Sequence, residues 1–160
     1  MASSIDAAIR EAREGEYLSA LTMFLDVYGT ADSPPMNTPK AATGLSWFGL
    51  CLALIRKEYK PAIDLCNRAI GLEFYNGDHY ANLARIYLAA GKRKKALEVA
   101  EEGLKASPDG EYLKEVRESI GVRARPSVPF LDRTHPINVS LGQSRHAKKV
   151  ADKERKGGRK

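Results

Sequence analysis

Apolar residues recur along most of this chain at the spacing of amphipathic helices, and short polar turns separate the helical stretches. Residues 3–30 contain two such stretches, which Gly15 divides. Two more pairs occupy residues 43–74 and 77–108, and a single amphipathic stretch follows at 111–120. The pattern therefore predicts an all-α chain of three helical hairpins and one final helix.

The helix predicted over Leu45–Ile55 is apolar on nearly every side. A helix of this kind needs cover from more than one neighbour, as the first helix of a middle hairpin would receive. Glycine in a helix costs about 1 kcal/mol relative to alanine, so we expect another helix to cross closely at Gly49. Its partner helix contains Pro61, which suits a first helical turn.

The stretch from Gly29 to Lys40 holds three prolines and cannot continue a helix. It makes the first hairpin about eight residues longer than the others. Two interpretations remain open, a tolerated surface insertion and a loop that reaches over a binding groove.

The third hairpin carries an ordered series of aromatic, small and turn residues. Its members are Tyr80, Leu83, Ala84, Tyr87, Gly91, Ala96, Ala100 and Pro108. A similar order of aromatic and small residues occurs 34 residues upstream, as Tyr59, Ala62, Cys66 and Ala69. It occurs again near the start, as Gly15, Tyr17, Ala20 and Phe24. This order resembles the tetratricopeptide repeat (TPR) family. The resemblance implies a right-handed α-solenoid of three repeats with a capping helix, which serves as a scaffold for binding peptides or proteins.

In proteins of this family the first helix of each repeat lines a concave groove. The resemblance places a set of residues in that groove: Ile5, Ile9, Trp47, Cys51, Asp78, Ala81, Asn82 and Arg85. Of these, Ile5, Ile9, Trp47, Cys51, Asn82 and Arg85 are the predicted partner-binding residues. The groove is expected to be apolar with one polar end, and to suit a hydrophobic or extended peptide. The alternative is that Trp47 and Phe48 simply belong to the core.

Members of the family that clamp a C-terminal carboxylate use lysine and asparagine in their first two repeats. This chain has Ile5, Ile9 and Phe48 at those places, which argues against such a clamp. Asn82 and Arg85 are the groove residues left to hold a carboxylate or a peptide backbone.

Charge divides the chain after Gly121. Residues 1–121 contain 15 Lys/Arg against 17 Asp/Glu, whereas residues 122–160 contain 11 against 3. We expect residues 122–143 to be extended because of their prolines, with the apolar run Val128–Leu131 docked on the array. Residues 144–160 are expected to be a disordered basic tail. The whole stretch is similar to the tails of small, uncharacterised bacterial TPR proteins, which implies a bacterial source.

An alternative function is nucleic-acid or ribosome association through the basic tail. Its cations could also meet an acidic protein partner, and no aromatic side chain lies among them to stack on bases. The candidate contacts are Arg145, Lys148, Lys149, Lys153, Arg155 and Lys156.

No motif of a known catalytic, cofactor-binding or metal-binding type is visible. The three histidines are scattered, and His79 is expected to be a surface or groove residue at a helix start. Cys51 and Cys66 are too far apart for a redox or zinc motif and are expected to be free core thiols. Without a secretory signal or a run of about 18 apolar residues, the chain is predicted to be a non-enzymatic, cytoplasmic protein that needs no cofactor.

Overall fold

The computed structural model describes residues 2–29 and 40–121, which belong to one compact unit. This part of the chain contains seven α-helices, one π-helical segment and no strand. The elements are α1 (Ala2–Glu14), α2 (Tyr17–Tyr28), α3 (Ala41–Cys51), η1 (Leu52–Arg56), α4 (Tyr59–Leu72), α5 (Gly77–Ala89), α6 (Arg93–Ala106) and α7 (Glu111–Ile120). None of the helices in these two ranges is long and apolar enough to cross a membrane.

Three predictions fall on residues that lie outside the described ranges. They concern the proline-rich stretch between Gly29 and Lys40, the extended segment 122–143 with its docking run Val128–Leu131, and the basic tail 144–160.

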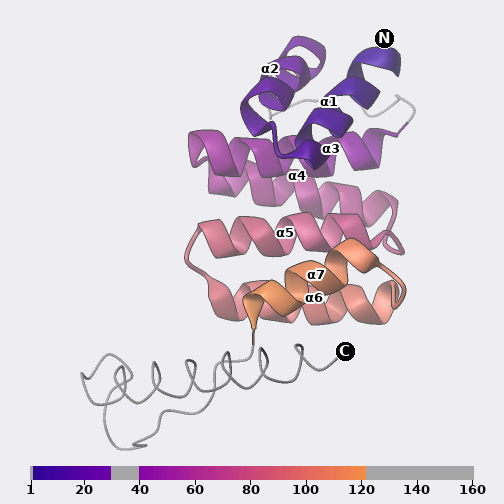
Figure 1. Ribbon diagram of the computed structural model, residues 1–160, viewed down its shortest axis with the longest axis vertical. Helices are drawn as coiled ribbons and strands as arrows, with labels where there is room; N and C mark the ends of the chain where they lie inside the picture. The colour runs from indigo at the N-terminus through magenta and orange to yellow at the C-terminus, as the bar shows by residue number, and fades with distance from the viewer. Residues whose placement is uncertain (1, 30–39, 122–160) are drawn as a thin grey trace, which may run out of the picture. The chain divides into compact units, whose positions relative to one another are not determined.

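The helices form two rows (Figure 1). α1 pairs with α2, α3 with α4 and α5 with α6, as hairpins stacked one on the next. α1, α3, α5 and α7 each contact the next helix of that series, and we call them the inner row. Among the described helices, no Cα atom of α2 lies within 8 Å of one in α4, and none of α4 lies within 8 Å of one in α6, so the outer row is more widely spaced.

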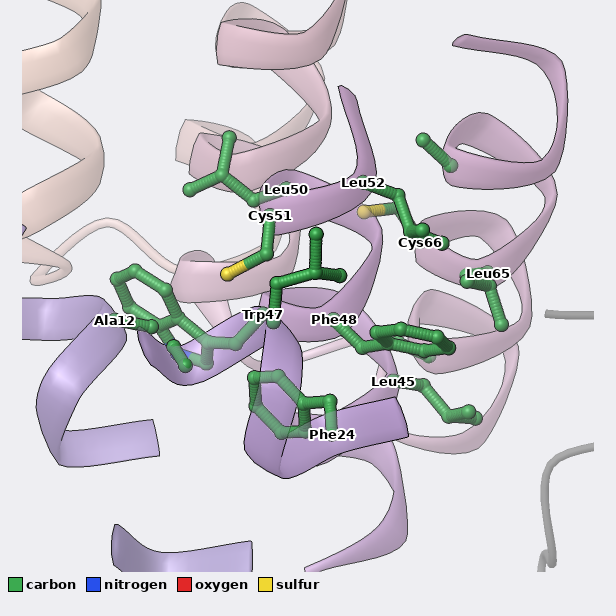
Figure 2. Packing of buried hydrophobic residues seen from close by; sticks show 14 of the residues in the cluster. Ala12, Phe24, Leu45, Trp47, Phe48, Leu50, Cys51, Leu52, Leu65 and Cys66 are labelled. Atoms are coloured by element: carbon green, nitrogen blue, oxygen red, sulfur yellow. The ribbon is translucent and has the colours of Figure 1, made fainter. Parts of the chain in front are cut away.

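Every residue of α3 except Thr43 is buried. Figure 2 shows Trp47 pointing toward Ala12 of α1, while Phe48 points to the other side of α3, toward Leu65 of α4. Phe48 also meets the ring of Phe24 from α2 at a centroid distance of 5.7 Å. The prediction that this apolar helix is covered from several sides is therefore confirmed.

Two glycines allow neighbouring helices to approach closely. A Cβ atom on Gly49 would lie 2.8 Å from the carbonyl oxygen of Ala62 in α4, which confirms the predicted crossing. A Cβ atom on Gly103 of α6 would lie 2.6 Å from Cγ of Tyr80 and 2.9 Å from Cδ2 of Leu113. Gly103 therefore sets the distance between α6, α5 and α7.

The turns inside the three hairpins share a left-handed residue. Gly15 has a φ of 94° and Gly91 a φ of 73°, the left-handed conformation in which a glycine commonly ends a helix. The middle turn uses Lys57 instead, at a φ of 61°. Its ammonium group donates to the carbonyl oxygen of Leu54 at 3.0 Å, and so caps the π-helical segment that ends this hairpin's first helix.

We expect Gly103→Ala to lower the free energy of unfolding by about 1–3 kcal/mol, because the added methyl group overpacks the contact with Tyr80 and Leu113. Gly71→Ala is the matched control, since a Cβ atom there meets nothing within 4 Å in the helix α4. That change should be neutral or stabilise the protein by up to about 1 kcal/mol. Urea unfolding of both variants checks the prediction, and equal effects would contradict it.

Candidate functional site

The predicted groove residues lie on the inner row, but most of their side chains are buried. Ile5, Ile9 and Trp47 are 3%, 8% and 3% exposed, and Cys51 and Asn82 are fully buried. Only Arg85 of the six is partly exposed. The expected apolar groove is thus filled, and the alternative that placed Trp47 and Phe48 in the core agrees with their burial.

Two side chains from the ends of the array lie over Trp47. The ring of Tyr112, from α7, stacks on the indole at a centroid distance of 5.6 Å and an interplanar angle of 18°. The guanidinium carbon of Arg13, from α1, lies 5.8 Å from the indole centroid. Arg13 also pairs with Asp78 of α5 at 2.8 Å. These contacts explain why Trp47 is buried although it faces the inner side of α3.

Arg85 is the centre of a hydrogen-bond network on the same row. Its Nη1 donates to the hydroxyl of Tyr112 at 2.8 Å, and its Nη2 donates to the hydroxyl of Tyr17 at 2.7 Å. The Tyr112 hydroxyl in turn donates to Oδ1 of Asn82 at 3.0 Å. Nδ2 of Asn82 donates to Oγ of Ser46 at 2.9 Å, which satisfies the buried amide from α3.

We call Arg13, Tyr17, Asp78, Arg85 and Tyr112 the inner polar cluster. They come from α1, α2, α5 and α7, and all are at least partly exposed. The side chains of Arg13 and Asp78 are 55% and 27% exposed. A polar, partly accessible layer therefore lies over Trp47, one of the apolar residues that the sequence placed in a groove.

The electrostatics of Arg85 are set by its burial and by the two tyrosines that accept its hydrogen bonds. Burial disfavours its charged form, but the phenol oxygens of Tyr112 and Tyr17 outweigh that effect and raise the pKa of Arg85. Burial raises the pKa of Tyr112, and the nearby positive charge of Arg85 partly opposes the rise. The site thus holds a half-buried positive charge whose hydrogen-bond partners are neutral.

Sequence reasoning missed three of the five cluster residues. Arg13, Tyr17 and Tyr112 lie near helix ends, and nothing in the repeat pattern directs them toward Arg85. The signal available was weak: Tyr17 and Tyr112 are aromatic residues with a polar tip, placed near helix starts.

The described residues offer little that is suited to catalysis. Burial raises the pKa of both Cys51 and Cys66 to about 12, so neither thiol is a nucleophile near neutral pH. Both are free and buried, as predicted. No group of three or more potential ligand side chains that could hold a metal ion occurs within residues 2–29 and 40–121. The predicted tail contacts, Arg145 to Lys156, lie outside these ranges.

His79 is fully buried, so the expectation of a surface or groove residue is wrong. It lies in the first turn of α5, next to the capping residue Asn76, where its Nε2 meets Oε2 of Glu73 at 3.3 Å. No partner for its Nδ1 occurs in the described part of the chain. Helix starts are commonly exposed, but here the first turn of α5 is closely packed: a Cβ atom on Gly77 would lie 3.1 Å from Oγ of Ser107 and 3.5 Å from Cδ2 of Leu113.

Burial lowers the pKa of His79, and the hydrogen bond and negative charge of Glu73, together with Asp78, only partly oppose this. The folded protein then binds fewer protons than the unfolded chain, in which histidine has a pKa of about 6.5. The stabilisation that follows from the lowered pKa of His79 is complete above a pH of about 6.5 and is lost as the pH falls through that value. We expect thermal stability to drop between about pH 7.5 and 5, and to drop less in His79→Gln. If the melting temperatures of the two proteins fell by the same amount over this pH range, the prediction would be contradicted.

We expect Tyr112→Phe to lower the free energy of unfolding by about 1–3 kcal/mol, because it leaves Oδ1 of the buried Asn82 without a donor. The ring that stacks on Trp47 remains. Tyr75→Phe is the control, since Tyr75 is 62% exposed, and it should change little. Urea unfolding followed by the fluorescence of Trp47, the single tryptophan, measures both. Equal midpoints would show that the hydroxyl bond is unimportant.

Comparison with known proteins gives structural matches only. No family model and no curated protein matches the chain. The first TPR domain of the human RPAP3 protein, solved by NMR, is 17% identical with a TM-score of 0.54, and the match covers 75% of this chain and 89% of that one.

The second TPR domain of human RPAP3, in complex with an HSP70 peptide, is 19% identical, with a TM-score of 0.53 and coverage of 76% and 94%. The first TPR of Spaghetti (RPAP3), bound to an HSP90 peptide, is 18% identical, with a TM-score of 0.52 and coverage of 74% and 87%. The all-α fold predicted from the sequence is therefore confirmed, and the described part of the chain has the fold of a tetratricopeptide repeat domain.

Proposed function

We propose that this protein is a non-enzymatic protein-interaction module that binds a peptide or protein partner on the inner row of helices. The observation that carries the proposal is the inner polar cluster. It gathers side chains from α1, α2, α5 and α7 on one face, although Tyr17 and Arg85 are 68 residues apart in the sequence. Partly exposed Arg and Tyr side chains are typical of protein-binding surfaces.

The buried residues beneath the cluster have a supporting role in this proposal. Trp47 holds Tyr112 by stacking, and Asn82 holds its hydroxyl by a hydrogen bond. Such support fixes the contact side chains before a partner arrives, which reduces the entropy lost on binding. The partner would therefore contact Arg85 and its exposed neighbours, while Ile5, Ile9 and Cys51 pack the inner row from within.

Two further points support a binding role over a catalytic one. The structural matches are to TPR domains, one of them bound to an HSP90 peptide and one in complex with an HSP70 peptide. The thiols, with pKa values of about 12, are protonated near neutral pH. We place the protein in a bacterial cytoplasm as an adaptor, on the likeness of its C-terminal stretch to bacterial tails.

A library of random peptides displayed on phage, selected on the full chain, tests the proposal. We expect selected peptides to shift the amide NMR signals of α1, α3, α5 and α7 in the ¹⁵N-labelled protein, and to leave the exposed side of α6 unchanged. Arg13→Ala should weaken binding by about fivefold or more, because arginine at a partner-binding surface often contributes about 1 kcal/mol or more.

Arg10→Ala is the matched control, because Arg10 is an exposed residue of the same helix outside the cluster. Its loss should leave affinity unchanged. Signal shifts confined to the outer row, or equal affinities of the two variants, would refute binding on the inner row.

A further inference from the structure

Six exposed cations gather where the second and third hairpins turn. Three flank the turn from η1 into α4 and three lie at the start of α6, and we call them the basic edge: Arg56, Lys57, Lys60, Lys92, Lys94 and Lys95. Residues 56–60 and 92–95 contain one acidic residue, Glu58. The excess of positive charge is local, because residues 1–121 as a whole contain 15 Lys/Arg against 17 Asp/Glu.

The two turns are neighbours in the stack. The hydroxyl of Tyr59, at the start of α4, donates to the carbonyl oxygen of Ala89, at the end of α5, at 3.0 Å. The turn that follows, from α5 into α6, lies at the left of the stack in Figure 1. The ammonium group of Lys95 lies 5.9 Å from the ring centroid of Tyr87 in α5. The cations of both turns therefore belong to one edge of the array.

Few of these charges are neutralised. The ion pairs at this edge are long, Arg56 with Glu58 at 3.9 Å and Lys94 with Glu98 at 3.8 Å, and all four side chains are exposed. Exposed ion pairs contribute little, because water screens them. The remaining cations of the basic edge form no ion pair with a carboxylate in the described ranges.

The position of these cations does not favour the helices. Lys60 lies in the first turn of α4, Lys94 and Lys95 lie in the first turn of α6, and neither turn contains an acidic residue. The start of a helix carries a partial positive charge, which favours Asp and Glu and disfavours cations. Local features that oppose stability are typical of functional sites. The stability of the fold therefore does not account for the basic edge.

From this exposed and largely unpaired charge we infer that the basic edge binds the phosphate backbone of a double-stranded nucleic acid. A duplex presents one negative charge for about every 1.7 Å of its axis, so several phosphates can meet the cations of both turns at once. Lysine is a compact point charge, which suits phosphate contacts that do not depend on the base sequence. The inference is independent of the proposed function, because the basic edge lies on turns and the peptide would bind on the inner row.

The aromatic side chains at this edge favour a duplex over a single strand. Proteins that bind single strands stack the bases on aromatic rings. Tyr59 and Tyr87 are half-buried and pack against the hydrophobic core, and Lys95 lies over the ring of Tyr87. Neither ring is free to stack on a base. A duplex needs no such ring, because its bases stack on one another and its phosphates face outward.

The apolar side chains favour a nucleic acid over an anionic membrane. Surfaces that dock on membranes combine cations with apolar side chains that enter the lipid. The exposed pair Phe74 and Tyr75 lies in the turn between α4 and α5, at the far ends of these helices from the basic edge. Among residues 54–60 and 89–95, Ile55 is the one exposed large hydrophobic side chain. The basic edge therefore has charge without a comparable apolar anchor.

Fluorescence anisotropy of labelled duplexes tests the inference on the full chain. RNA and DNA duplexes of about 20 base pairs would each be titrated at several concentrations of sodium chloride. The edge variant combines Lys92→Gln, Lys94→Gln and Lys95→Gln. We expect it to bind about tenfold or more weakly, and the slope of log affinity against log salt to fall by about 2–3, because each lost phosphate contact releases about one counterion fewer.

The matched control combines Arg10→Gln, Lys105→Gln and Lys114→Gln, which are exposed positions outside the basic edge. It has the same net charge as the edge variant, and we expect it to keep most of the affinity and the slope of the wild-type chain. Residues 122–160, with 11 Lys/Arg against 3 Asp/Glu, are unchanged in both and add the same background.

The fold of the edge variant is checked separately. It should melt no lower than the wild-type chain, because it removes cations from the start of a helix. Lys60→Gln is a second variant at the other turn, and it should lower the salt slope by about 1. Peptides selected on the inner row should bind the edge variant and the wild-type chain equally well.

Tighter binding of RNA or of DNA assigns the basic edge to that duplex, and equal binding assigns it to the phosphate backbone of both. Equal losses in the edge variant and the control would overturn the inference, as would an affinity that does not depend on salt. Two further probes are vesicles of equal parts phosphatidylserine and phosphatidylcholine, and polyglutamate. If either bound the basic edge more tightly than both duplexes, the inference would be overturned in favour of a membrane or an acidic protein.

Discussion

Helix α3 is in contact with α1, α2, α4 and α5. Its residues are apolar almost throughout, so it can be stable only when those neighbours are present together. Trp47 and Phe48 point to opposite sides of this helix, and each anchors a different neighbour. At Gly49 the backbone of α4 approaches so closely that a side chain would collide with it. The position of every hairpin follows from this central helix.

The fold could be predicted because its determinants are local. The 3.6-residue period, the turns at Gly15 and Gly91 and the small residues at close crossings all act within one hairpin or between adjacent helices. Even the crossing at Gly49 could be predicted, because glycine inside an apolar helix needs a compensating contact. The π-helical end of the helix, Leu52–Arg56, could not, because its period differs from that of an α-helix only over a single turn.

The candidate site was harder to predict because its contacts join distant segments. Trp47, Asn82 and Arg85 lie on α3 and α5 of the inner row, but Tyr112 from α7 and Tyr17 from the start of α2 decide which of them remain accessible. Repeat patterns specify where a residue faces on its own helix. They do not specify which long side chain from another hairpin covers it.

Stacked helical repeats ordinarily contact only their nearest neighbours, so that their stability can be treated as a sum of terms along one dimension. This chain departs from that description. The Arg13–Asp78 pair joins the first hairpin to the third, and Arg85 joins the first hairpin to the last helix through Tyr17 and Tyr112. A hairpin at either end cannot fray without also breaking bonds to a hairpin that is not its neighbour. The array is therefore expected to unfold as one cooperative unit, in which a change at one end is felt at the other.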